Sequence, residues 1–149
     1  MKIEDIKNIC IVGAGNMGHQ IAVCCALAGY KVTCTDISQE MLNKAEGFAK
    51  SYLPERVTKG KLTQEKADIA LANLHFTLSL EEAAGEADFI IEAAVEKMVI
   101  KRKLFADLDR IAPLHAILAT NSSYIVSSQV ADATKRPEKI CNMHFFNPA

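Results

Sequence analysis

The sequence lacks the features that would direct a chain to nucleic acid, to a membrane or to secretion. Its 149 residues carry 17 basic and 18 acidic side chains, so a net charge near −1 gives no electrostatic reason to bind nucleic acid or an anionic membrane surface. No apolar run approaches the roughly 18 residues of a membrane-spanning helix. Residues 1–5 (MKIED) do not have the basic and then apolar layout of a secretion signal. We expect a soluble, cytoplasmic protein.

Patterns typical of metal sites and disulfides are also lacking. The five cysteines are odd in number and include no C-x-x-C, and Cys10, Cys24 and Cys34 fall inside apolar segments. They are typical of reduced, small core residues in a cytosolic protein. The four histidines do not pair with each other or with cysteine at the spacing of zinc ligands, so we predict no metal site.

What the chain does contain is an alternation of short β-branched runs with longer helical segments. We predict strands over residues 8–12, 31–35, 75–78, 88–92, 116–120 and 139–143. Helices are predicted over residues 16–28 and 100–111, and a hairpin of two further helices over 38–72. The alternation predicts an α/β fold with a doubly wound, mostly parallel sheet of the Rossmann type and a helical hairpin after the second strand.

The hairpin is predicted from its capping and breaking residues. Ser38 and Thr63 are suited to cap its two helices. We expect the first helix to run to about residue 53, where Pro54 disturbs it, and Gly60 to break the chain before the second.

A G-x-G-x-x-G motif at residues 13–18 follows the first predicted strand and opens the first predicted helix. Gly13 is placed to make the tight turn, Gly15 to let the backbone approach a pyrophosphate, and Gly18 to let the helix pack closely on the sheet. The helix then begins at Asn16 and Met17, where backbone N–H groups point toward a bound phosphate. In this context the motif predicts a dinucleotide site.

An acidic residue, Asp36, ends the second predicted strand 23 residues after Gly13. A carboxylate here accepts hydrogen bonds from the ribose hydroxyls but repels a 2′-phosphate, and residues 37–39 offer no arginine to receive one. We therefore predict NAD rather than NADP. The alternatives are a tight turn with a surface aspartate and, on the loop alone, an FAD-binding domain.

Polar residues also follow the fourth, fifth and sixth predicted strands. These segments are 92–96 (EAAVE), with Lys101 five residues further on, 121–123 (NSS) and 144–148 (HFFNP). Because ligands of a doubly wound sheet bind outside the carboxyl ends of its strands, the three segments predict a shared site.

Together these segments resemble the 3-hydroxyacyl-CoA dehydrogenase family, particularly its bacterial 3-hydroxybutyryl-CoA members. The resemblance covers essentially the whole chain and rests on four stretches: GAGNMGHQIA (13–22), IEAAVEKMVIKRKLF (91–105), ATNSS (119–123) and HFFNP (144–148). It implies NAD-dependent oxidation of a short-chain (S)-3-hydroxyacyl-CoA to the 3-ketoacyl-CoA, with acyl-CoA as the substrate.

The resemblance also implies catalytic roles. His144 is similar to the family's base, which removes the proton of the 3-hydroxyl group as hydride leaves carbon 3, and an imidazole suits proton transfer in either direction near neutral pH. Ser123 matches the serine that hydrogen-bonds the reacting oxygen. Asn147 matches the asparagine beside the histidine and the nicotinamide. The alternative for His144 is a structural residue at a strand end.

Four further residues resemble the family's cofactor contacts. Glu96 and Lys101 match residues that line the ribose and nicotinamide region, Asn121 lies in the matching segment after the fifth strand, and Asp36 matches the ligand of the adenosine ribose. The residues from 121 to 123 have the alternative role of capping the following helix. For Lys101 the alternative is a solvated helix face.

The helical hairpin corresponds to the part of the family fold that lies against CoA. Arg56, Lys59 and Lys61 are candidates for contacts with CoA phosphates, but Glu55 and Glu65 interleave with them, which favours a mixed, solvated face. Elsewhere the family commonly has a serine where this chain has Tyr124 and an asparagine where it has Lys97. The tyrosine places the substrate pocket and its chain-length preference in question.

Two parts of the family pattern fall beyond Ala149. One is a glutamate about a dozen residues past the histidine; this carboxylate orients the imidazole and stabilises its charged form. The other is a helical C-terminal domain that closes over the substrate and forms a homodimer interface. We expect residues 1–149 to be the NAD-binding domain alone, able to bind NAD but impaired in catalysis. The alternative is a non-catalytic nucleotide-binding module. The 3-hydroxyisobutyrate and 6-phosphogluconate dehydrogenases share a similar glycine loop, but they use a lysine base and lack HFFNP.

Overall fold

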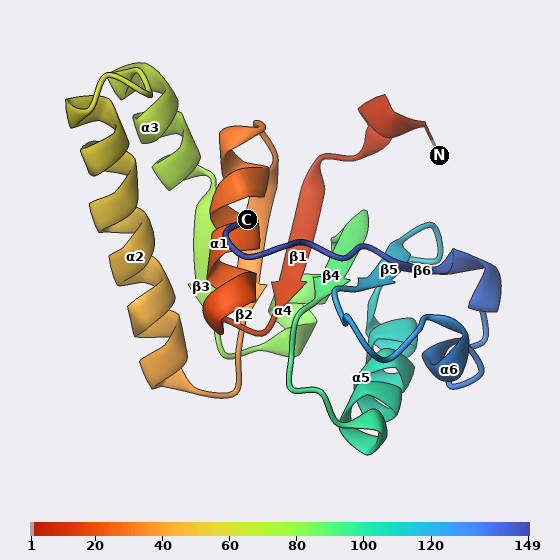
Figure 1. Cartoon of the computed structure of the whole chain (residues 1–149). Coiled ribbons are helices and arrows are strands. Elements are labelled where there is room, and N and C mark those ends of the chain that lie inside the picture. Colours follow the sequence, from red (N-terminus) through yellow and green to blue (C-terminus); the bar gives the residue numbers. More distant parts are fainter. Residues whose placement is uncertain (1) are drawn as a thin grey trace.

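The computed structural model describes residues 2–149 and confirms the predicted fold class (Figure 1). Six parallel strands form one sheet in the order β3-β2-β1-β4-β5-β6, which is the order of a doubly wound dinucleotide fold. The strands are β1 (Asn8–Val12), β2 (Lys31–Thr35), β3 (Leu74–Thr77), β4 (Phe89–Glu92), β5 (Ile117–Thr120) and β6 (Ile140–Asn142).

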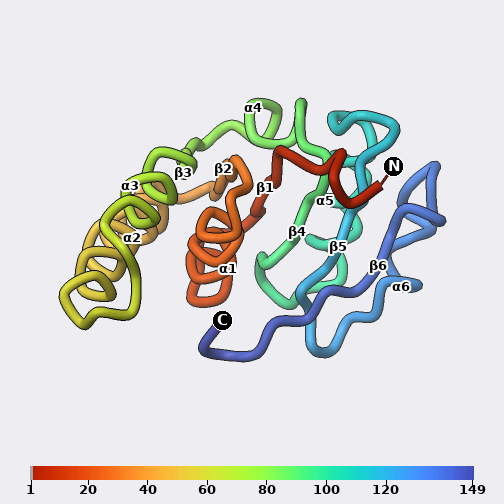
Figure 2. Tube along the Cα trace, turned by 90° about the horizontal axis from the view of Figure 1, so that it is seen from above, coloured from red at the N-terminus to blue at the C-terminus, as the bar shows by residue number. Residues whose placement is uncertain are grey.

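Helices cover both faces of the sheet, and in Figure 2 α1 and α4 lie on opposite sides of the strands. They are α1 (Asn16–Leu27), α2 (Gln39–Thr58), α3 (Gln64–Ala72), α4 (Leu80–Ala84), α5 (Met98–Ile111) and α6 (Ser128–Ala131), with 3₁₀ turns at Ile3–Asp5 and Pro137–Lys139. None of the helices within residues 2–149 is both long and apolar enough to cross a membrane.

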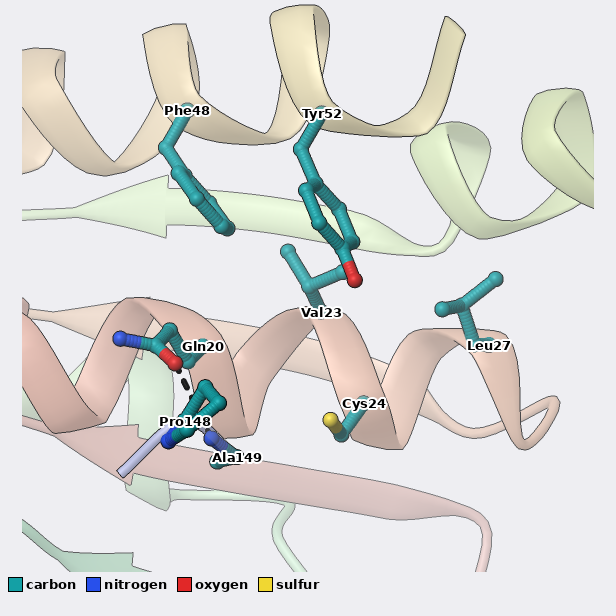
Figure 3. A pocket seen from close by; sticks show the side chains of 8 residues that line it. All are labelled: Gln20, Val23, Cys24, Leu27, Phe48, Tyr52, Pro148 and Ala149. Atoms are coloured by element: carbon teal, nitrogen blue, oxygen red, sulfur yellow. Dashed lines mark hydrogen bonds between the residues drawn. The ribbon is translucent and has the colours of Figure 1, made fainter. Parts of the chain in front are cut away.

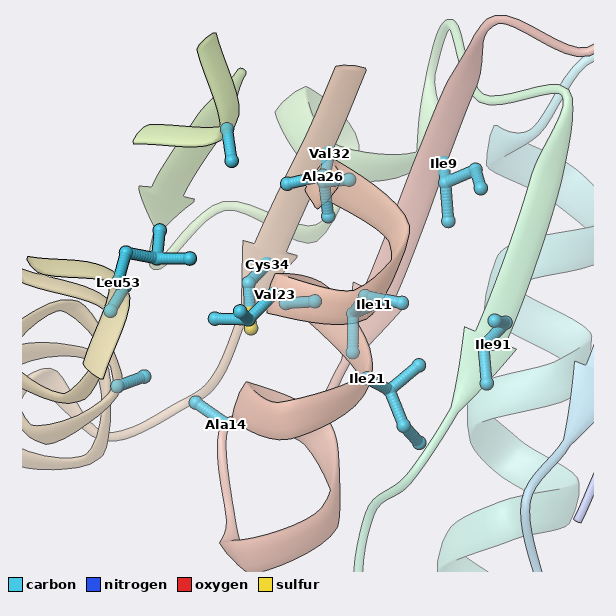
Figure 4. Close-up of a cluster of buried hydrophobic side chains, with 14 of the residues drawn as sticks. Ile9, Ile11, Ala14, Ile21, Val23, Ala26, Val32, Cys34, Leu53 and Ile91 are labelled. Carbon is cyan, nitrogen blue, oxygen red and sulfur yellow. The ribbon is translucent and has the colours of Figure 1, made fainter. Parts of the chain in front are cut away.

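The alternation of side chains along β1 divides the core into two layers. Ile9 and Ile11 pack with α1, α2 and α3 on one face (Figure 4), whereas Cys10 and Val12 pack with α4, α5 and α6 on the other. A central parallel strand buried on both faces needs such a continuous apolar run. Cys10 and Cys34 serve as buried core residues, and all five cysteines are free thiols.

The helical hairpin after β2 is present, and α2 and α3 pack against each other. Ser38 caps α2 by accepting a hydrogen bond from the Met41 N–H, and Thr63 caps α3 in the same way. The prediction that the first helix stops near Pro54 was wrong, because α2 continues to Thr58. Pro54 is exposed, and so is Lys50 four residues earlier, so water can satisfy the carbonyl group that the proline leaves without a donor.

No residue range was predicted for two short helices, α4 and α6. They have five and four residues, which is too short to show a helical period in the sequence. Both are fixed by tertiary packing, since Ala84 and Val130 are fully buried in the second core layer.

At the amino ends of the strands, Asp88 fixes the entry into the sheet. Its Oδ2 accepts hydrogen bonds from the backbone N–H groups of Lys7 and Asn8, each at 2.9 Å, and its Oδ1 lies 2.8 Å from His115 Nε2. Although partial burial disfavours its charged form, these donors hold the pKa of Asp88 below its usual range. The charged carboxylate therefore stabilises the start of β1 against β4.

We expect Asp88→Ala to lower the free energy of unfolding by about 1 to 2 kcal/mol at neutral pH, because two backbone donors lose their acceptor. A carboxyl group with a lowered pKa in the folded state stabilises the fold above its unfolded pKa, and this contribution is lost as the pH falls. The difference between wild type and variant should therefore shrink below about pH 4. Urea unfolding across this range measures it, with the exposed Glu86→Ala as control; a difference that is constant with pH would contradict the assignment.

Candidate functional site

The loops that leave five of the six strands begin side by side at one edge of the sheet. Backbone hydrogen bonds extend the ladders by a residue beyond the strand ends, so each loop leaves from a fixed position. These bonds are Gly13 N to Thr35 O (2.8 Å), Ala93 N to Val12 O (2.8 Å), Asn121 N to Glu92 O (2.7 Å) and Met143 N to Thr120 O (2.9 Å). The predicted site residues lie in or next to these loops and in α1 and α5.

The glycine loop is shaped by two close approaches of backbone to backbone. Gly13 has a φ of +101°, and a Cβ atom there would lie 2.7 Å from the Ala93 carbonyl oxygen. A Cβ atom at Gly18 would lie only 1.7 Å from the Gly13 carbonyl oxygen, so no side chain fits at this position. The third glycine was predicted to let α1 approach the sheet. A Cβ atom there would lie 3.6 Å from Ile11 Cγ2 of β1, but the still closer neighbour is the loop itself.

The start of α1 has the properties of a phosphate site. Gly15 is the N-cap residue, and it supplies no side-chain hydrogen bond to the first turn of the helix. A Cβ atom at Gly15 would meet nothing within 4 Å, so the space beside the loop is open. The N–H groups that begin the helix at Asn16 and Met17 are therefore suited to receive an anionic group such as a pyrophosphate.

Asp36 is fixed at the end of β2, next to this loop. Its Oδ2 accepts a hydrogen bond from the Ala14 N–H at 2.8 Å, and its Oδ1 accepts one from the Ser38 N–H at 2.9 Å. Each carboxylate oxygen has a further lone pair, and the side chain is only partly buried. It can therefore hold the glycine loop and still accept hydrogen bonds from ribose hydroxyl groups.

A buried ion pair that was not predicted from the sequence joins the end of β4 to α5. Lys101 Nζ lies 2.5 Å from Glu92 Oε1, and neither side chain is exposed to solvent. The interpretation of Lys101 as part of a solvated helix face was thus wrong. Its ammonium group also lies 3.8 Å from Glu96 Oε1, and the Glu96 side chain remains 47% exposed. The sequence feature that could have predicted this pair is a carboxylate, Glu92, at the end of an apolar strand, followed nine residues later by Lys101.

The loop after β5 is held by its own polar side chains. Ser122 Oγ donates a hydrogen bond to Glu96 Oε2 at 2.7 Å and accepts one from the Ile125 N–H at 2.6 Å. Asn121 Oδ1 accepts a hydrogen bond from the Phe145 N–H at 2.7 Å, which ties this loop to the segment after β6. The suggestion that these residues cap a following helix was wrong, since the next helix, α6, has Ser127 as its N-cap residue.

Three side chains predicted to act on the substrate are exposed at this edge. Ser123, His144 and Asn147 are all accessible to solvent. The His144 ring packs on Phe146 at a centroid distance of 4.8 Å, and Asn147 Oδ1 accepts a hydrogen bond from Gln20 Nε2 at 3.3 Å. Figure 2 shows this C-terminal segment running from β6 to α1.

A hollow of about 210 Å³ lies beside the site, between α1, α2 and the last residues of the chain (Figure 3). A hydrogen bond from the Ala149 N–H to Gln20 Oε1, of 3.0 Å, closes one side of it. None of the predicted site residues lines this hollow, whose lining residues are Gln20, Val23, Cys24, Leu27, Phe48, Tyr52, Pro148 and Ala149.

The basic residues of the hairpin are arranged as a mixed surface. Lys59, the C-cap residue of α2, is paired with Glu55, and the Arg56 guanidinium lies over the Tyr52 ring, 5.8 Å from its centroid. Lys61 is exposed. Within residues 2–149, no three His, Cys, Asp or Glu side chains are grouped as metal ligands.

The fold and the site together define a dinucleotide-binding protein. The sheet is doubly wound and parallel, a glycine loop precedes a helix without a side-chain cap, and a carboxylate follows β2. The family model for the NAD-binding domain of 3-hydroxyacyl-CoA dehydrogenases matches residues 8–149. The chain belongs to this family, and NAD is confirmed as its cofactor.

Relatives of known name agree with this membership. The chain is 38% identical over 144 residues to a probable 3-hydroxybutyryl-CoA dehydrogenase of Bacillus subtilis, covering 97% of this chain and 50% of the relative. It is 36% identical over 144 residues to the peroxisomal fatty acid beta-oxidation multifunctional protein of Arabidopsis thaliana, covering 97% and 20%. The crystal structure of a 3-hydroxybutyryl-CoA dehydrogenase from Escherichia coli matches with a TM-score of 0.93 and 38% identity, covering 97% and 30%. The chain thus spans half or less of the length of these proteins.

We expect Gly18→Ala and Gly15→Ala to differ in kind. The first places a methyl group against the Gly13 carbonyl and should reduce the free energy of unfolding by about 3 kcal/mol. The second enters open space and should cost at most about 1 kcal/mol, the effect of a poorer N-cap residue. The added methyl group should nevertheless weaken NADH binding about tenfold, since it stands where the backbone meets the phosphates. Urea unfolding and NADH fluorescence titration measure the two effects; equal stability of both variants would contradict the loop geometry.

Proposed function

We propose that this chain is the cofactor-binding part of an NAD-dependent dehydrogenase that oxidises short-chain (S)-3-hydroxyacyl-CoA to 3-ketoacyl-CoA. The observation that carries this proposal is the position of the segment 144–148. It follows β6, is bonded to the end of β5 through Asn121 and Phe145, and is bonded to α1 through Asn147 and Gln20. The candidate base therefore lies on the same edge of the sheet as the glycine loop, which begins α1.

In this function His144 accepts the proton of the substrate 3-hydroxyl group, and in the reverse direction it returns a proton to the oxygen. Its imidazole is exposed, which leaves it accessible to a substrate. Ser123 is exposed too and supplies a hydroxyl donor for the reacting oxygen. A bound NAD would supply the acceptor for the hydride of carbon 3. The chain's contribution is to orient these groups and to move the proton.

The cofactor is held in this proposal by two sets of residues. Asp36 binds the adenosine ribose, and the N–H groups after Gly15 receive the pyrophosphate. Glu96, Lys101 and Asn121 position the ribose and nicotinamide half. The support for this division is the fit described above: an open, uncapped helix start, and a Glu96 carboxylate that is half exposed beside the strand ends.

Within residues 2–149, no carboxylate is hydrogen-bonded to His144, and this observation bears on the activity of the chain alone. A neighbouring carboxylate normally orients the histidine of an acid–base pair. We propose that a helical second domain supplies this glutamate, most of the acyl pocket and a homodimer interface. The 149-residue chain then binds NAD but is a poor catalyst. The same observation favours the second candidate function, a non-catalytic nucleotide-binding module.

The cellular location and the acyl-chain preference of the complete enzyme are also part of the proposal. A cytoplasmic location stays a prediction, since one relative is named as peroxisomal. The preference for short acyl chains also stays a prediction, and Tyr124, which is 86% exposed next to Ser123, is the side chain placed to influence it. Arg56, Lys59 and Lys61 remain candidates for CoA contacts, with a solvated face favoured.

We expect Asp36→Ala to raise the Kd for NADH by about ten- to a hundredfold, because charge-assisted hydrogen bonds to the ribose are lost. It should affect NADPH much less, because the variant no longer repels a 2′-phosphate. Isothermal titration of both nucleotides measures this, with Asp36→Asn as a variant that keeps an acceptor oxygen without the charge. An unchanged preference for NADH would count against Asp36 as the ribose ligand.

Oxidation of NADH with acetoacetyl-CoA tests the catalytic proposal. We expect a low rate from the 149-residue chain and a much higher rate from a form extended by a second domain like that of the relatives. In the extended form, His144→Gln should reduce kcat by about a hundredfold or more, while NADH affinity stays unchanged. Full activity of the short chain would overturn the role given to the second domain, and no activity in either form would favour the non-catalytic module.

A further inference from the structure

The Lys101 ammonium group lies near two carboxylates, that of Glu92 at the end of β4 and that of Glu96 in the following loop, and it is much closer to the first. Lys101 Nζ is 2.5 Å from Glu92 but 3.8 Å from Glu96. Glu92 is completely buried, whereas the Glu96 side chain is 47% exposed. The lysine is therefore paired with the carboxylate that no ligand can reach.

Both carboxylate oxygens of Glu92 accept hydrogen bonds from other parts of the chain. Its Oε1 accepts hydrogen bonds from Lys101 Nζ and from the Ala94 N–H at 2.7 Å, and its Oε2 accepts one from Thr120 Oγ1 at 2.7 Å. These donors come from α5, from the loop after β4 and from β5. With its position fixed in this way, Glu92 also fixes the ammonium group of Lys101.

Glu96 keeps an oxygen available as a result. Its Oε2 accepts the hydrogen bond from Ser122 Oγ. Its Oε1 is 3.8 Å from the ammonium group of Lys101, which is its only oppositely charged neighbour within 4 Å among residues 2–149. We propose that Glu92 is a positioning residue for cofactor binding: it holds Lys101 back from Glu96, so that the Glu96 carboxylate stays free to accept hydrogen bonds from the nicotinamide half of NAD. This inference rests on the role given to Glu96 in the proposed function.

A purely stabilising role would not require this arrangement. Buried ion pairs contribute little net stability, because the desolvation of both charges offsets their attraction, and well-packed apolar side chains often replace them without loss. The pair is therefore better explained by what it does to a neighbouring charge. Without the Glu92 charge, the nearest anion to the ammonium group is Glu96, and a close Lys101–Glu96 pair would occupy the oxygen that the cofactor needs.

The test is nucleotide binding by the 149-residue chain carrying Glu92→Gln. The glutamine side chain keeps hydrogen-bonding atoms at both positions but removes the charge. We expect the Kd for NADH to rise about tenfold, while the Kd for ADP stays within about twofold, because ADP reaches only the glycine loop and Asp36. Equal weakening of both nucleotides, or no change in either, would overturn the inference.

The double variant Glu92→Gln/Lys101→Met separates positioning from a structural effect. If Glu92 acts by restraining Lys101, Glu92→Gln should cause no further loss of NADH affinity in the Lys101→Met background. An equal loss in both backgrounds would contradict the proposal. Thermal unfolding of each variant without nucleotide provides the stability control.

If Glu92→Gln fails to fold, Thr120 offers a second approach. Thr120→Val removes the hydroxyl donor to Glu92, and we expect it to weaken NADH binding selectively, whereas Thr120→Ser should restore it. Selective weakening without rescue by serine would contradict the role of the hydroxyl group, and so would an unchanged Kd for NADH.

Glu96→Gln distinguishes failure of this inference from failure of the proposed function. If it leaves the Kd for NADH unchanged, the assignment of Glu96 to the cofactor is wrong, and the inference falls with it. If it weakens NADH binding while Glu92→Gln and Thr120→Val do not, the assignment of Glu96 stands and only the positioning role of Glu92 is overturned.

Discussion

The arrangement of the candidate site depends on how closely α1 begins against the end of β1. The loop between them has no room for a Cβ atom at Gly18, which would lie 1.7 Å from the Gly13 carbonyl oxygen, or at Gly13, which would lie 2.7 Å from the Ala93 carbonyl oxygen. The loop is thus pressed between the helix on one side and the β4 loop on the other. This contact directs the first N–H groups of α1 over the sheet edge where the other strands end, and Asp36 then fixes the loop through the Ala14 N–H.

Much of the fold follows from local patterns, and its exceptions have physical reasons. The run NICIV predicts a strand buried on both faces, and Ile9 and Cys10 indeed pack into different core layers. The helix end predicted at Pro54 was wrong because the effect of a proline depends on which side of the helix it faces. On the exposed side of α2, water replaces the lost donor, and no local pattern of the sequence reveals that side. The short helices α4 and α6 are fixed by burial of Ala84 and Val130, which is a property of the folded chain.

The positions of the candidate residues at one edge of the sheet could be predicted from the sequence, but the contacts between them could not. The position of ligand sites at strand ends and the family resemblance predicted that Asp36, Glu96 and His144 lie at one edge of the sheet. They did not indicate that Lys101 is buried against Glu92, or that Asn121 bonds the backbone of residue 145 rather than capping a helix. Such contacts join residues that are far apart in the chain or on different elements. Helical periodicity only divides α5 into faces, and it cannot tell whether a lysine on the inner face finds a carboxylate.

The two halves of the proposed cofactor site are supported by separate sets of contacts. On one side Asp36 bonds the glycine loop and the start of α2; on the other, Glu92 bonds Lys101, Thr120 and the β4 loop. No side chain is shared between the two sets. The backbone of Ala93, pressed against Gly13, is where they meet. Changes to side chains on one side therefore act locally, whereas a shift of the β4 loop would move both halves together. In the proposed function the Glu92–Lys101 pair lies on the nicotinamide side of the cofactor, where the distribution of charge outweighs the pair's small net contribution to folding.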